Sequence, residues 1–263
     1  MITSLNNKTV KEIAALSQKG KERNKKDVFV AEGVKMFMEA PKERICGVYV
    51  AGSAEQGLLE MCGAKLAELS YELVSDEVFG KMSDTMTPQG ILCLVRQFHY
   101  DLTFLLENSE KERKLFIVLE DIQDPGNLGT IFRTAEAAGA SGVIMSRHTA
   151  DVYNPKTIRS TMGSVYRVPF VVVEDMPCII KALQEKGVCV YAAYLGGKAC
   201  YEAFDYRKST AFLIGNEGNG LRKETADCAD VLIRIPMEGS VESLNAAVAS
   251  SVLLYEAYRQ RRV

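Results

Sequence analysis

The stretch that decides the fold is Leu115-Phe-Ile-Val-Leu119-Glu-Asp-Ile-Gln-Asp124-Pro-Gly-Asn127-Leu-Gly129-Thr-Ile-Phe-Arg133. Its first five residues are all apolar, which is typical of a strand buried on both faces of a parallel sheet. Asp124-Pro-Gly is a turn signal, and the residues after it predict a helix at 127–139. A buried strand that leads through a turn into a helix is the repeating unit of a parallel α/β fold.

The same alternation continues to the end of the sequence. It predicts strands at 142–145, 168–173, 188–193, 210–214 and 231–235, and helices at 154–162, 175–186, 220–227 and 243–260. Strands that alternate with helices predict a parallel sheet covered by helices. Ligands of such sheets bind at the carboxyl ends of the strands, so we expect a site in the turns that follow them.

The residues before this sheet predict a second, smaller α/β domain. Helices are expected at 10–16, 32–40, 56–69 and 76–82, and strands at 29–31, 45–50, 71–74 and 91–95. The basic stretch Lys19–Lys26 is expected to be a loop, because Gly20 interrupts the first helix. The stretch Glu107–Lys114 is dense in charge and marks a boundary. We therefore predict an N-terminal domain at 1–103, a linker at 104–114 and a C-terminal domain at 115–263.

Composition excludes several classes of protein. The chain has 263 residues, of which 47% are hydrophobic and 25% charged, as in globular proteins. The net charge of −2 gives no overall attraction to nucleic acid, so a nucleic-acid binder has to gather its basic residues locally. No apolar run is long enough to cross a bilayer, and the first residues lack the apolar stretch of a signal peptide. We expect a cytoplasmic protein without a membrane partner.

The cysteines and histidines predict neither a metal site nor a nucleophile. Seven cysteines without a Cys-x-x-Cys pair, and the two histidines His99 and His148, suit neither a zinc site nor a disulfide framework. Reduced cysteines packed as small hydrophobic residues are the simpler expectation. The sequence has no Gly-x-Ser-x-Gly turn, and a histidine in a loop is more often solvated than catalytic. No metal is therefore expected.

The first motif lies in the turn after the strand at 115–119. Asn127 is interpreted as the N-cap of the following helix, and Gly129 allows another backbone to approach the first helical turn. Arg133 follows Gly129 by four residues, on the face that lacks a side chain there. An ordinary turn followed by a solvated arginine would have the same pattern.

The second motif, Gly215-Asn216-Glu217-Gly218-Asn-Gly220, directly follows the strand at 210–214. It is neither the Gly-x-Gly-x-x-Gly of dinucleotide folds nor a phosphate-binding P-loop, because Leu-Arg follows Gly220 in place of Lys-Ser/Thr. The bare backbone of such a loop can hydrogen-bond a flat heterocycle. A tight turn without a ligand is the alternative.

The third motif follows the strand at 231–235 and reads Ile235-Pro-Met237-Glu-Gly239-Ser-Val-Glu-Ser243-Leu244-Asn245. Ser243 and Asn245 are suited to cap the helix that begins there. The small residues that follow, Ala246, Ala247, Ala249, Ser250 and Ser251, allow the helix to pack closely against another element. A capped helix packed on the sheet, without any ligand, explains the pattern equally well.

Together, the three motifs strongly resemble the signature motifs of the SpoU/TrmH family, which are RNA ribose 2′-O-methyltransferases of the SPOUT superfamily. The resemblance runs in the family's order from residue 115 to the end. Residues 1–103 resemble, more loosely, the family's N-terminal substrate-binding domain, a small module similar to ribosomal proteins. That likeness rests on Phe29-Val-Ala-Glu-Gly33 and Thr87-Pro-Gln-Gly-Ile91. The resemblance implies a Rossmann-like parallel sheet with a deep trefoil knot, a homodimer, and S-adenosylmethionine as cofactor.

The resemblance also implies roles for individual residues. Arg133 is the expected catalytic residue, surrounded by Asn127, Glu217, Ser243 and Asn245. The expected cofactor-binding residues are Gly215, Asn216, Gly220, Ile235, Met237, Leu244 and Asn245. For RNA we expect contacts from Lys21, Arg23, Lys25, Lys26, Arg133, Lys156 and Arg159.

The expected reaction is methyl transfer to a ribose hydroxyl. The sulfonium leaving group is neutral, so the chemistry needs no metal, but the hydroxyl is hardly ionised at neutral pH. A guanidinium has a pKa above about 12, so we expect Arg133 to position phosphate and stabilise the developing alkoxide. The N-terminal domain favours ribosomal RNA as substrate, because tRNA enzymes of the family usually lack it. A tRNA 2′-O-methyltransferase and a catalytically silent RNA-binding or assembly protein remain the alternatives.

Overall fold

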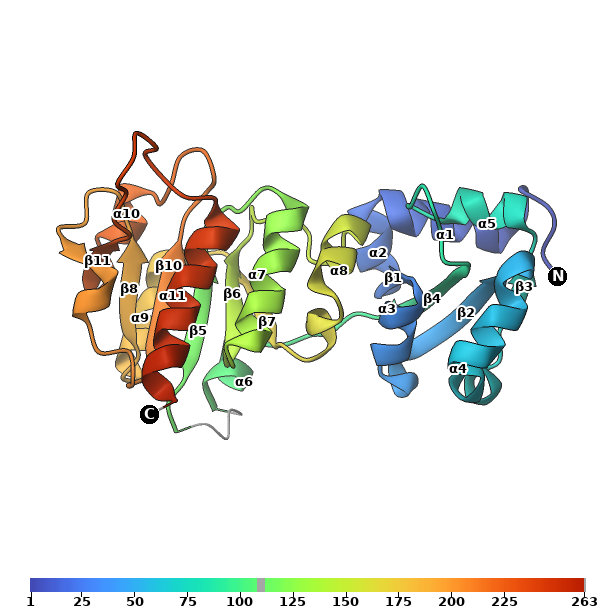
Figure 1. Ribbon diagram of the computed structural model, residues 1–263, viewed down its shortest axis with the longest axis horizontal. Coiled ribbons are helices and arrows are strands. Elements are labelled where there is room, and N and C mark those ends of the chain that lie inside the picture. The colour runs from blue at the N-terminus through green and yellow to red at the C-terminus, as the bar shows by residue number, and fades with distance from the viewer. Residues whose placement is uncertain (108–111, 263) are drawn as a thin grey trace. The chain divides into compact units, whose positions relative to one another are not determined.

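The computed structural model describes residues 1–107 and 112–262. These residues form two compact units (Figure 1). One unit contains Met1–Phe98 together with Asp151–Tyr166, and the other contains His99–Ala150 together with Arg167–Val263. The division is therefore not a single cut in the sequence. Residues 108–111, which fall within the expected linker, lie outside the described residues.

The C-terminal unit is built on a parallel sheet of seven strands. Their bounds are β5 Leu115–Leu119, β6 Gly142–Ser146, β7 Phe170–Val173, β8 Cys189–Ala193, β9 Ala199–Cys200, β10 Thr210–Ile214 and β11 Val231–Arg234. The strand order is β7-β6-β5-β10-β8-β11-β9, and each neighbouring pair is parallel. The predicted parallel α/β sheet is confirmed. The two-residue strand β9 was not predicted.

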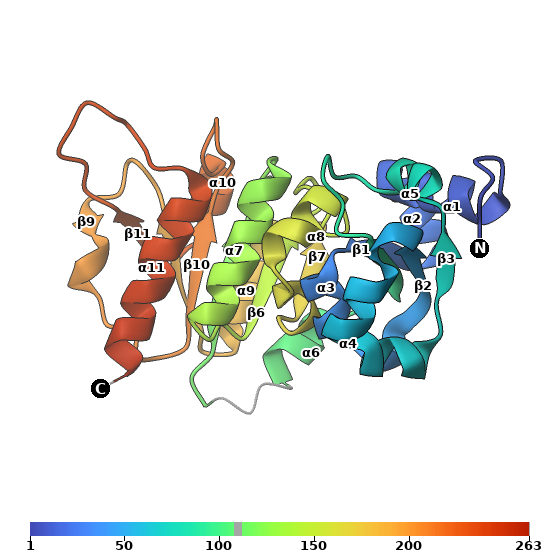
Figure 2. The same ribbon diagram turned by 45° about the vertical axis from the view of Figure 1, so that its right-hand side comes forward.

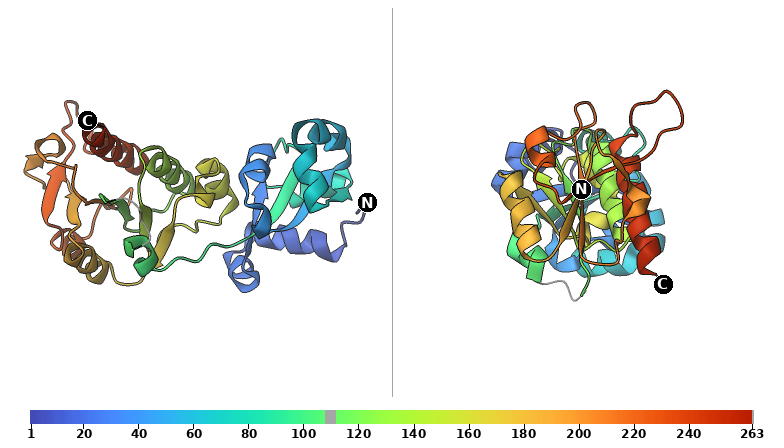
Figure 3. Two further views of the ribbon diagram at one scale, coloured as in Figure 1. Left: turned by 90° about the horizontal axis from the view of Figure 1, so that it is seen from below. Right: turned by 90° about the vertical axis from the view of Figure 1, so that its left-hand side faces the viewer.

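Helices cover both faces of this sheet. They are α6 Leu102–Glu107, α7 Pro125–Ala137, α9 Met176–Glu185, α10 Lys223–Ala226 and α11 Ala246–Arg261. The helices α7 and α11 lie side by side on one face, and α9 lies on the other (Figures 1 and 3). The side-chain hydroxyls of Thr134 on α7 and Ser251 on α11 are 3.2 Å apart. Small residues thus allow these two helices to pack closely.

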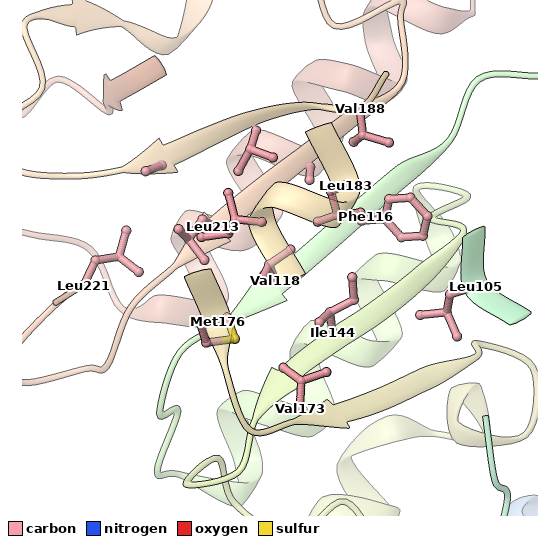
Figure 4. Close-up of a cluster of buried hydrophobic side chains, with 14 of the residues drawn as sticks. Leu105, Phe116, Val118, Ile144, Val173, Met176, Leu183, Val188, Leu213 and Leu221 are labelled. Carbon is pink, nitrogen blue, oxygen red and sulfur yellow. The ribbon is translucent and has the colours of Figure 1, made fainter. Parts of the chain in front are cut away.

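The core beneath α9 explains why the strands are apolar throughout. Phe116 and Val118 of β5 pack in one cluster with Leu183 of α9 (Figure 4). Ile180 of α9 belongs to the same cluster. The alternate residues of β5 point to the opposite face of the sheet and are also fully buried. Leu105 and Leu106 of α6 belong to the same cluster. Residues 104–107 were expected to belong to the linker, but they are part of this helix, because its leucines are buried in the core.

The N-terminal unit contains a mixed sheet of four strands in the order β1-β4-β2-β3. The strands are β1 Val28–Glu32, β2 Ile45–Ala51, β3 Glu72–Val74 and β4 Ile91–Arg96, and the helices are α1 Lys8–Gln18, α2 Gly20–Lys26, α3 Val34–Glu39, α4 Glu55–Leu69 and α5 Asp76–Met82. The helices α1 and α5 pack on one face, and α3 and α4 on the other (Figure 2). The small α/β domain predicted from the sequence is present.

The prediction of a basic loop after Gly20 is wrong, because residues 20–26 form helix α2. The sequence pattern missed it since its buried side chain is not apolar but charged. Arg23 is 3% exposed and its guanidinium donates to the carbonyls of Leu16 and Ser17 and to Asp151. These bonds hold α2 against α1, and Asp27 ends the helix in a left-handed conformation with φ of 57°.

The segment Asp151–Tyr166, with helix α8 at Pro155–Thr161, packs within the N-terminal unit. The ring of Tyr153 stacks on that of Phe29 with 4.7 Å between centroids. The Tyr166 hydroxyl donates to the carbonyl of Met36 at 3.1 Å. Aromatic packing and the ion pair between buried Arg23 and half-buried Asp151 therefore hold this segment among residues far away in the sequence.

Candidate active site

The three sequence motifs lie at the carboxyl ends of parallel strands. They follow β5, β10 and β11, and the loops after β10 and β11 lie at the same end of the sheet as the N-termini of α7 and α11 (Figure 1). In the sheet, β10 lies directly beside β5, with β8 between β10 and β11. The strand order thus brings the three motifs, which lie between residues 124 and 245 in the sequence, to the same end of the sheet.

The carboxylate of Glu217 joins the first motif to the second. Its Oε2 accepts a hydrogen bond from the amide of Gln123 at 2.9 Å, and its Oε1 accepts one from the amide of Asp124 at 3.1 Å. The Asn127 side chain donates a further bond to Oε1 at 2.9 Å. Two amides of the turn after β5 and one side chain of the first turn of α7 therefore fix the position of Glu217.

The side chains of Asn127 and Asn245 join the first motif to the third. Nδ2 of Asn245 donates to Oδ1 of Asn127 at 3.0 Å. The Oδ1 of Asn245 accepts bonds from the amides of Ala247 at 2.9 Å and Val248 at 3.3 Å, so Asn245 is the N-cap of α11. The structure thus brings Asn127, Glu217 and Asn245 into one hydrogen-bonded chain.

The hydrogen bonds lower the pKa of Glu217 below its usual value. Burial alone would raise this pKa, but the bonds from Gln123, Asn127 and Asp124 favour the ionised carboxylate and outweigh it. The site therefore holds a fixed negative charge at neutral pH. A carboxylate in this state orients donors and cations and does not supply a proton.

The prediction that Asn127 caps α7 is wrong. The N-cap is Asp124, whose Oδ1 accepts a hydrogen bond from the amide of Asn127 at 2.8 Å. The helix begins at Pro125, which is favoured at the first helical position because its missing N–H is not needed there. The side chain of Asn127 is consequently free to reach Glu217 and Asn245.

Arg133 and Ser243 are not part of this network. Arg133 lies on α7 and is exposed, six residues after Asn127, which is about 1.7 helical turns and places the two on different faces. Ser243 is exposed in the loop before α11. Among the described residues, neither side chain hydrogen-bonds Asn127, Glu217 or Asn245. Both are therefore available to a ligand or to RNA.

The loop of residues 215–220, here called the glycine loop, is tightly closed. Asn216 and Gly220 exchange two backbone hydrogen bonds, of 3.0 and 2.9 Å. Gly215 is buried, and a Cβ on it would lie 2.1 Å from the carbonyl carbon of Gly220, so only glycine fits there. Gly220 has φ of +66° and no atom within 4 Å of the place of a Cβ. The space beside Gly220 is thus open to a ligand, although its amide and carbonyl already bond Asn216.

The third motif adds apolar side chains at the same end of the sheet. Ile235, Met237 and Leu244 are half-buried, and Gly239 has open space around it. An open backbone with neighbouring apolar side chains suits a flat heterocycle and provides no cradle for phosphate. The residues present therefore fit an adenine-containing cofactor such as S-adenosylmethionine.

The sequence analysis missed the loop after β8, residues 194–197. Because β8 lies between β10 and β11, this loop emerges between the strands that carry the second and third motifs. Leu195 is 71% exposed, and a Cβ on Gly197 would lie 2.9 Å from the carbonyl carbon of Ile233. The pair Gly196-Gly197 directly after a predicted strand was the signal that could have identified it.

The residues expected to bind RNA differ in their availability. Lys21 and Lys25 are exposed on α2, whereas Lys26 forms an ion pair with Glu12. Arg23 is buried and already bound by Asp151 at 2.6 Å, so it offers no guanidinium to a phosphate. The expectation that Arg23 contacts RNA is therefore dropped.

The two basic residues of α8 are placed in the N-terminal unit. Lys156 is exposed at the start of α8, and Arg159 donates to Asp84 at 2.9 Å. The Arg159–Asp84 pair is partly exposed, and such pairs contribute little to stability, so it can be exchanged for another partner.

Two features of the composition can be compared with the structure. All seven cysteines are free thiols; Cys62 and Cys93 are buried and Cys228 packs partly buried against the core beneath α9, so packing as small hydrophobic residues holds for these three. Burial raises the pKa of the Cys93 thiol to about 12.

Within residues 1–107 and 112–262, no cluster of three His, Cys, Asp or Glu side chains could hold a metal ion. In the same ranges, no helix is long and apolar enough to cross a membrane.

Two family models match most of the chain. The model of the SpoU rRNA Methylase family matches residues 114–255, and that of the MRM3-like substrate binding domain matches residues 7–93. The second match confirms the resemblance of the N-terminal domain to a substrate-binding module. Together the two matches cover both units of the fold.

Characterised relatives align with almost the whole chain. The 23S rRNA (guanosine(2553)-2′-O)-methyltransferase RlmP of Bacillus subtilis is 33% identical over 258 residues, which cover 97% of each protein. The 23S rRNA (guanosine-2′-O-)-methyltransferase RlmB of Xylella fastidiosa is 32% identical over 246 residues, covering 90% of this chain and 98% of RlmB.

A solved structure agrees with both. The AdoMet-bound rRNA methyltransferase of Sinorhizobium meliloti superimposes with a TM-score of 0.82 at 33% identity and covers 98% of this chain and 97% of its own. The agreement extends over both units and over all three motifs. The chain therefore belongs to the SpoU/TrmH family of RNA methyltransferases.

Proposed function

We propose that this protein transfers the methyl group of S-adenosylmethionine to a ribose 2′-hydroxyl of ribosomal RNA of the 23S type. The observation that carries the proposal is the hydrogen-bonded chain Glu217–Asn127–Asn245, which links the three family motifs in one site. A catalytically silent RNA-binding protein would have no need to keep this network together with Arg133. The full-length relatives act on rRNA by name, which favours rRNA over tRNA.

S-adenosylmethionine, when bound, supplies a methyl group on a neutral sulfonium leaving group, so the reaction needs no metal. The protein has to position and activate a hydroxyl that is hardly ionised at neutral pH. Arg133, exposed on α7, holds an RNA phosphate and stabilises the alkoxide as it develops. Glu217 and Asn127 hold the first turn of α7, and Ser243 and Asn245 line the approach from the third motif.

The cofactor lies against the glycine loop and the third motif in this proposal. Gly215, Asn216 and Gly220 let the cofactor approach the backbone of the loop closely, while Ile235, Met237 and Leu244 provide apolar contact with adenine. Leu195, exposed in the loop after β8, adds a further apolar contact. This position of the cofactor is supported by the strand order, which places the loops after β8, β10 and β11 at the same end of the sheet.

The N-terminal unit binds the RNA in this proposal. Lys21, Lys25 and Lys26 on α2, with Lys156 and Arg159 on α8, carry the positive charge that a chain with a net charge of −2 has to provide locally. The match of residues 7–93 to a substrate binding domain supports this role.

We also infer a deep trefoil knot and a homodimer. The knot is supported by the path of the chain, which passes from β10 beside β5 to β11 beyond β8 and then returns to pack α11 against α7. The dimer is supported by the outer face of α11, where Val248 and Tyr255 are 48% and 47% exposed. Tyr255 also lines a hollow of about 690 Å³ with Tyr201 and Tyr258. We also propose that the protein works in the cytoplasm, in keeping with its rRNA-modifying relatives.

The test is methyl transfer from radiolabelled S-adenosylmethionine to 23S rRNA and to tRNA transcripts, followed by mapping of 2′-O-methyl ribose. We expect transfer to one nucleotide of 23S rRNA, unaffected by EDTA. Transfer to tRNA alone would assign the other substrate. Tight cofactor binding without transfer to any RNA would favour the silent protein.

A further inference from the structure

The two residues directly after β5, Glu120 and Asp121, each hold one end of the glycine loop. The amide of Glu120 donates to the carbonyl of Ile214 at 2.8 Å, so the pairing of β5 with β10 continues one residue beyond the strands. This places Glu120 and Asp121 beside the point where the glycine loop leaves β10. Neither residue is among the site residues expected from the sequence, although both lie in the turn that carries the first motif.

Glu120 holds the exit of the loop. It is 1% exposed, and its Oε2 accepts a hydrogen bond from the amide of Arg222 at 2.8 Å. Its Oε1 accepts bonds from the Arg222 guanidinium at 2.9 Å and from the Thr225 hydroxyl at 2.5 Å. A buried carboxylate is costly unless such partners satisfy it, so these bonds are not exchanged easily for others. The chain after Gly220 is therefore held against the end of β5.

Asp121 holds the entry of the loop. Its carbonyl accepts a hydrogen bond from the Asn216 side chain at 2.7 Å. Asp121 has φ of 55°, the left-handed region that side chains disfavour, and this conformation is maintained by Ser146. The Ser146 hydroxyl donates to the Asp121 carboxylate at 2.6 Å and accepts from the Asp121 amide at 2.8 Å.

We call Glu120 and Asp121, with their bonds to Arg222 and Asn216, the two anchors of the loop. Glu217 lies between Asn216 and Arg222 in the sequence, so the anchors hold the loop on both sides of it. A loop fixed at both ends presents its backbone groups in one arrangement, and this lowers the cost of ordering the loop around a ligand. We propose that Glu120 and Asp121 are positioning residues that hold the glycine loop in its cofactor-binding form. The inference rests on the proposed function, since it assigns the cofactor to this loop.

The experiment compares cofactor affinity with thermal stability in the full-length protein. Arg222→Ala removes the guanidinium that Glu120 binds but leaves the backbone bond, and Ser146→Ala removes both bonds that hold Asp121. The control is Asp230→Asn, because Asp230 precedes β11 at the opposite edge of the sheet and accepts bonds from Val190 at 2.7 Å and Gln184 at 3.0 Å. Calorimetry with S-adenosylmethionine gives Kd, and thermal unfolding gives Tm.

We expect Kd to rise at least fivefold in Arg222→Ala and in Ser146→Ala, at temperatures where both remain folded, while Asp230→Asn lowers Tm without changing Kd. If all three variants lower Tm and bind the cofactor like wild type, the anchors are merely structural and the inference is overturned. Thr225→Val, which removes only a hydroxyl, provides a milder variant should Arg222→Ala fail to fold. Absence of binding by the wild-type protein would instead contradict the proposed function.

Discussion

The amide side chain of Asn245 donates to that of Asn127 at 3.0 Å, although 118 residues separate them in the chain. Each of these asparagines has a second role. Asn127 also donates to Glu217, and Asn245 also caps α11. Both helix N-termini are thereby fixed relative to the glycine loop. Removing one amide should disturb all three motifs at once.

Replacement of Asn127 by alanine tests this coupling. The variant loses a hydrogen bond to a carboxylate, which is worth about 1.5–3 kcal/mol, or roughly a ten- to hundredfold change. We expect the methylation rate constant to fall by about that factor. Gln184→Ala is the matched control, since its amide also makes two bonds, to Cys228 and Asp230, but on α9. Equal turnover in both variants would contradict the role of the network.

The lowered pKa of Glu217 predicts how stability depends on pH. An ordinary glutamate has a pKa of 4.5, and the folded protein holds that of Glu217 below this value. The stabilisation by the ionised carboxylate is therefore fully present above the unfolded pKa and is lost as the pH falls through the lowered folded pKa. Glu217→Gln should be less stable than wild type near neutral pH, with a gap that narrows below about pH 4.5. Denaturant unfolding at several pH values measures the gap, and a constant or widening gap would exclude this account.

Arg133 is expected to act through its planar guanidinium. Arg133→Lys keeps the charge but loses the paired donors, so cofactor affinity should change little while the methylation rate falls about a hundredfold. Arg207→Lys is the control, because Arg207 is an exposed arginine that precedes β10 and lies at the opposite edge of the sheet. Single-turnover methylation and calorimetry separate the two effects. Near-normal turnover of Arg133→Lys would remove Arg133 from the mechanism.

The sequence predicted the strands of the parallel sheet well, because strands buried on both faces are apolar throughout. Strands β5 and β10 have the predicted bounds, 115–119 and 210–214. Helix α2 was missed because its buried position is filled by Arg23, whose partner Asp151 lies far away in the sequence. Local periodicity carries no information about such a pair.

Local sequence patterns were also unable to predict how the residues of the site are arranged in space. The motifs identified Asn127, Glu217 and Asn245, but their order in space depends on the insertion of β10 beside β5. The N-cap was assigned to Asn127 in place of Asp124, because both residue types cap helices and only the position of Pro125 separates them. Glu120 was overlooked, since a charged residue directly after a strand resembles any solvated turn.

Arg23 should contribute to the free energy of unfolding and not to RNA binding. Its side chain is 4% exposed while the Asp151 side chain is 36% exposed. Breaking a fully buried pair from one side costs about 3–5 kcal/mol, so we expect Arg23→Gln to cost roughly 2–3 kcal/mol because Asp151 retains contact with water. Lys21→Gln, two residues earlier on the exposed face of α2, should leave stability unchanged. Denaturant unfolding of both variants measures this difference, and equal stabilities would show that the Arg23–Asp151 pair contributes nothing.

The exposed lysines of α2 should instead govern RNA affinity. Phosphate contacts raise affinity through the release of counterions, and each lost contact lowers the slope of log K against log salt by roughly 0.7–0.9. Replacing Lys21 and Lys25 with glutamine should therefore weaken binding of an rRNA fragment and flatten its salt dependence by up to about 1.8. Cofactor affinity should not change, because both residues belong to the N-terminal unit. Lys181→Gln with Lys208→Gln, two exposed lysines of the C-terminal unit, makes the same change in net charge. Fluorescence anisotropy at several salt concentrations gives the slopes, and an equal flattening by both pairs would mean that overall charge, and not α2, attracts the RNA.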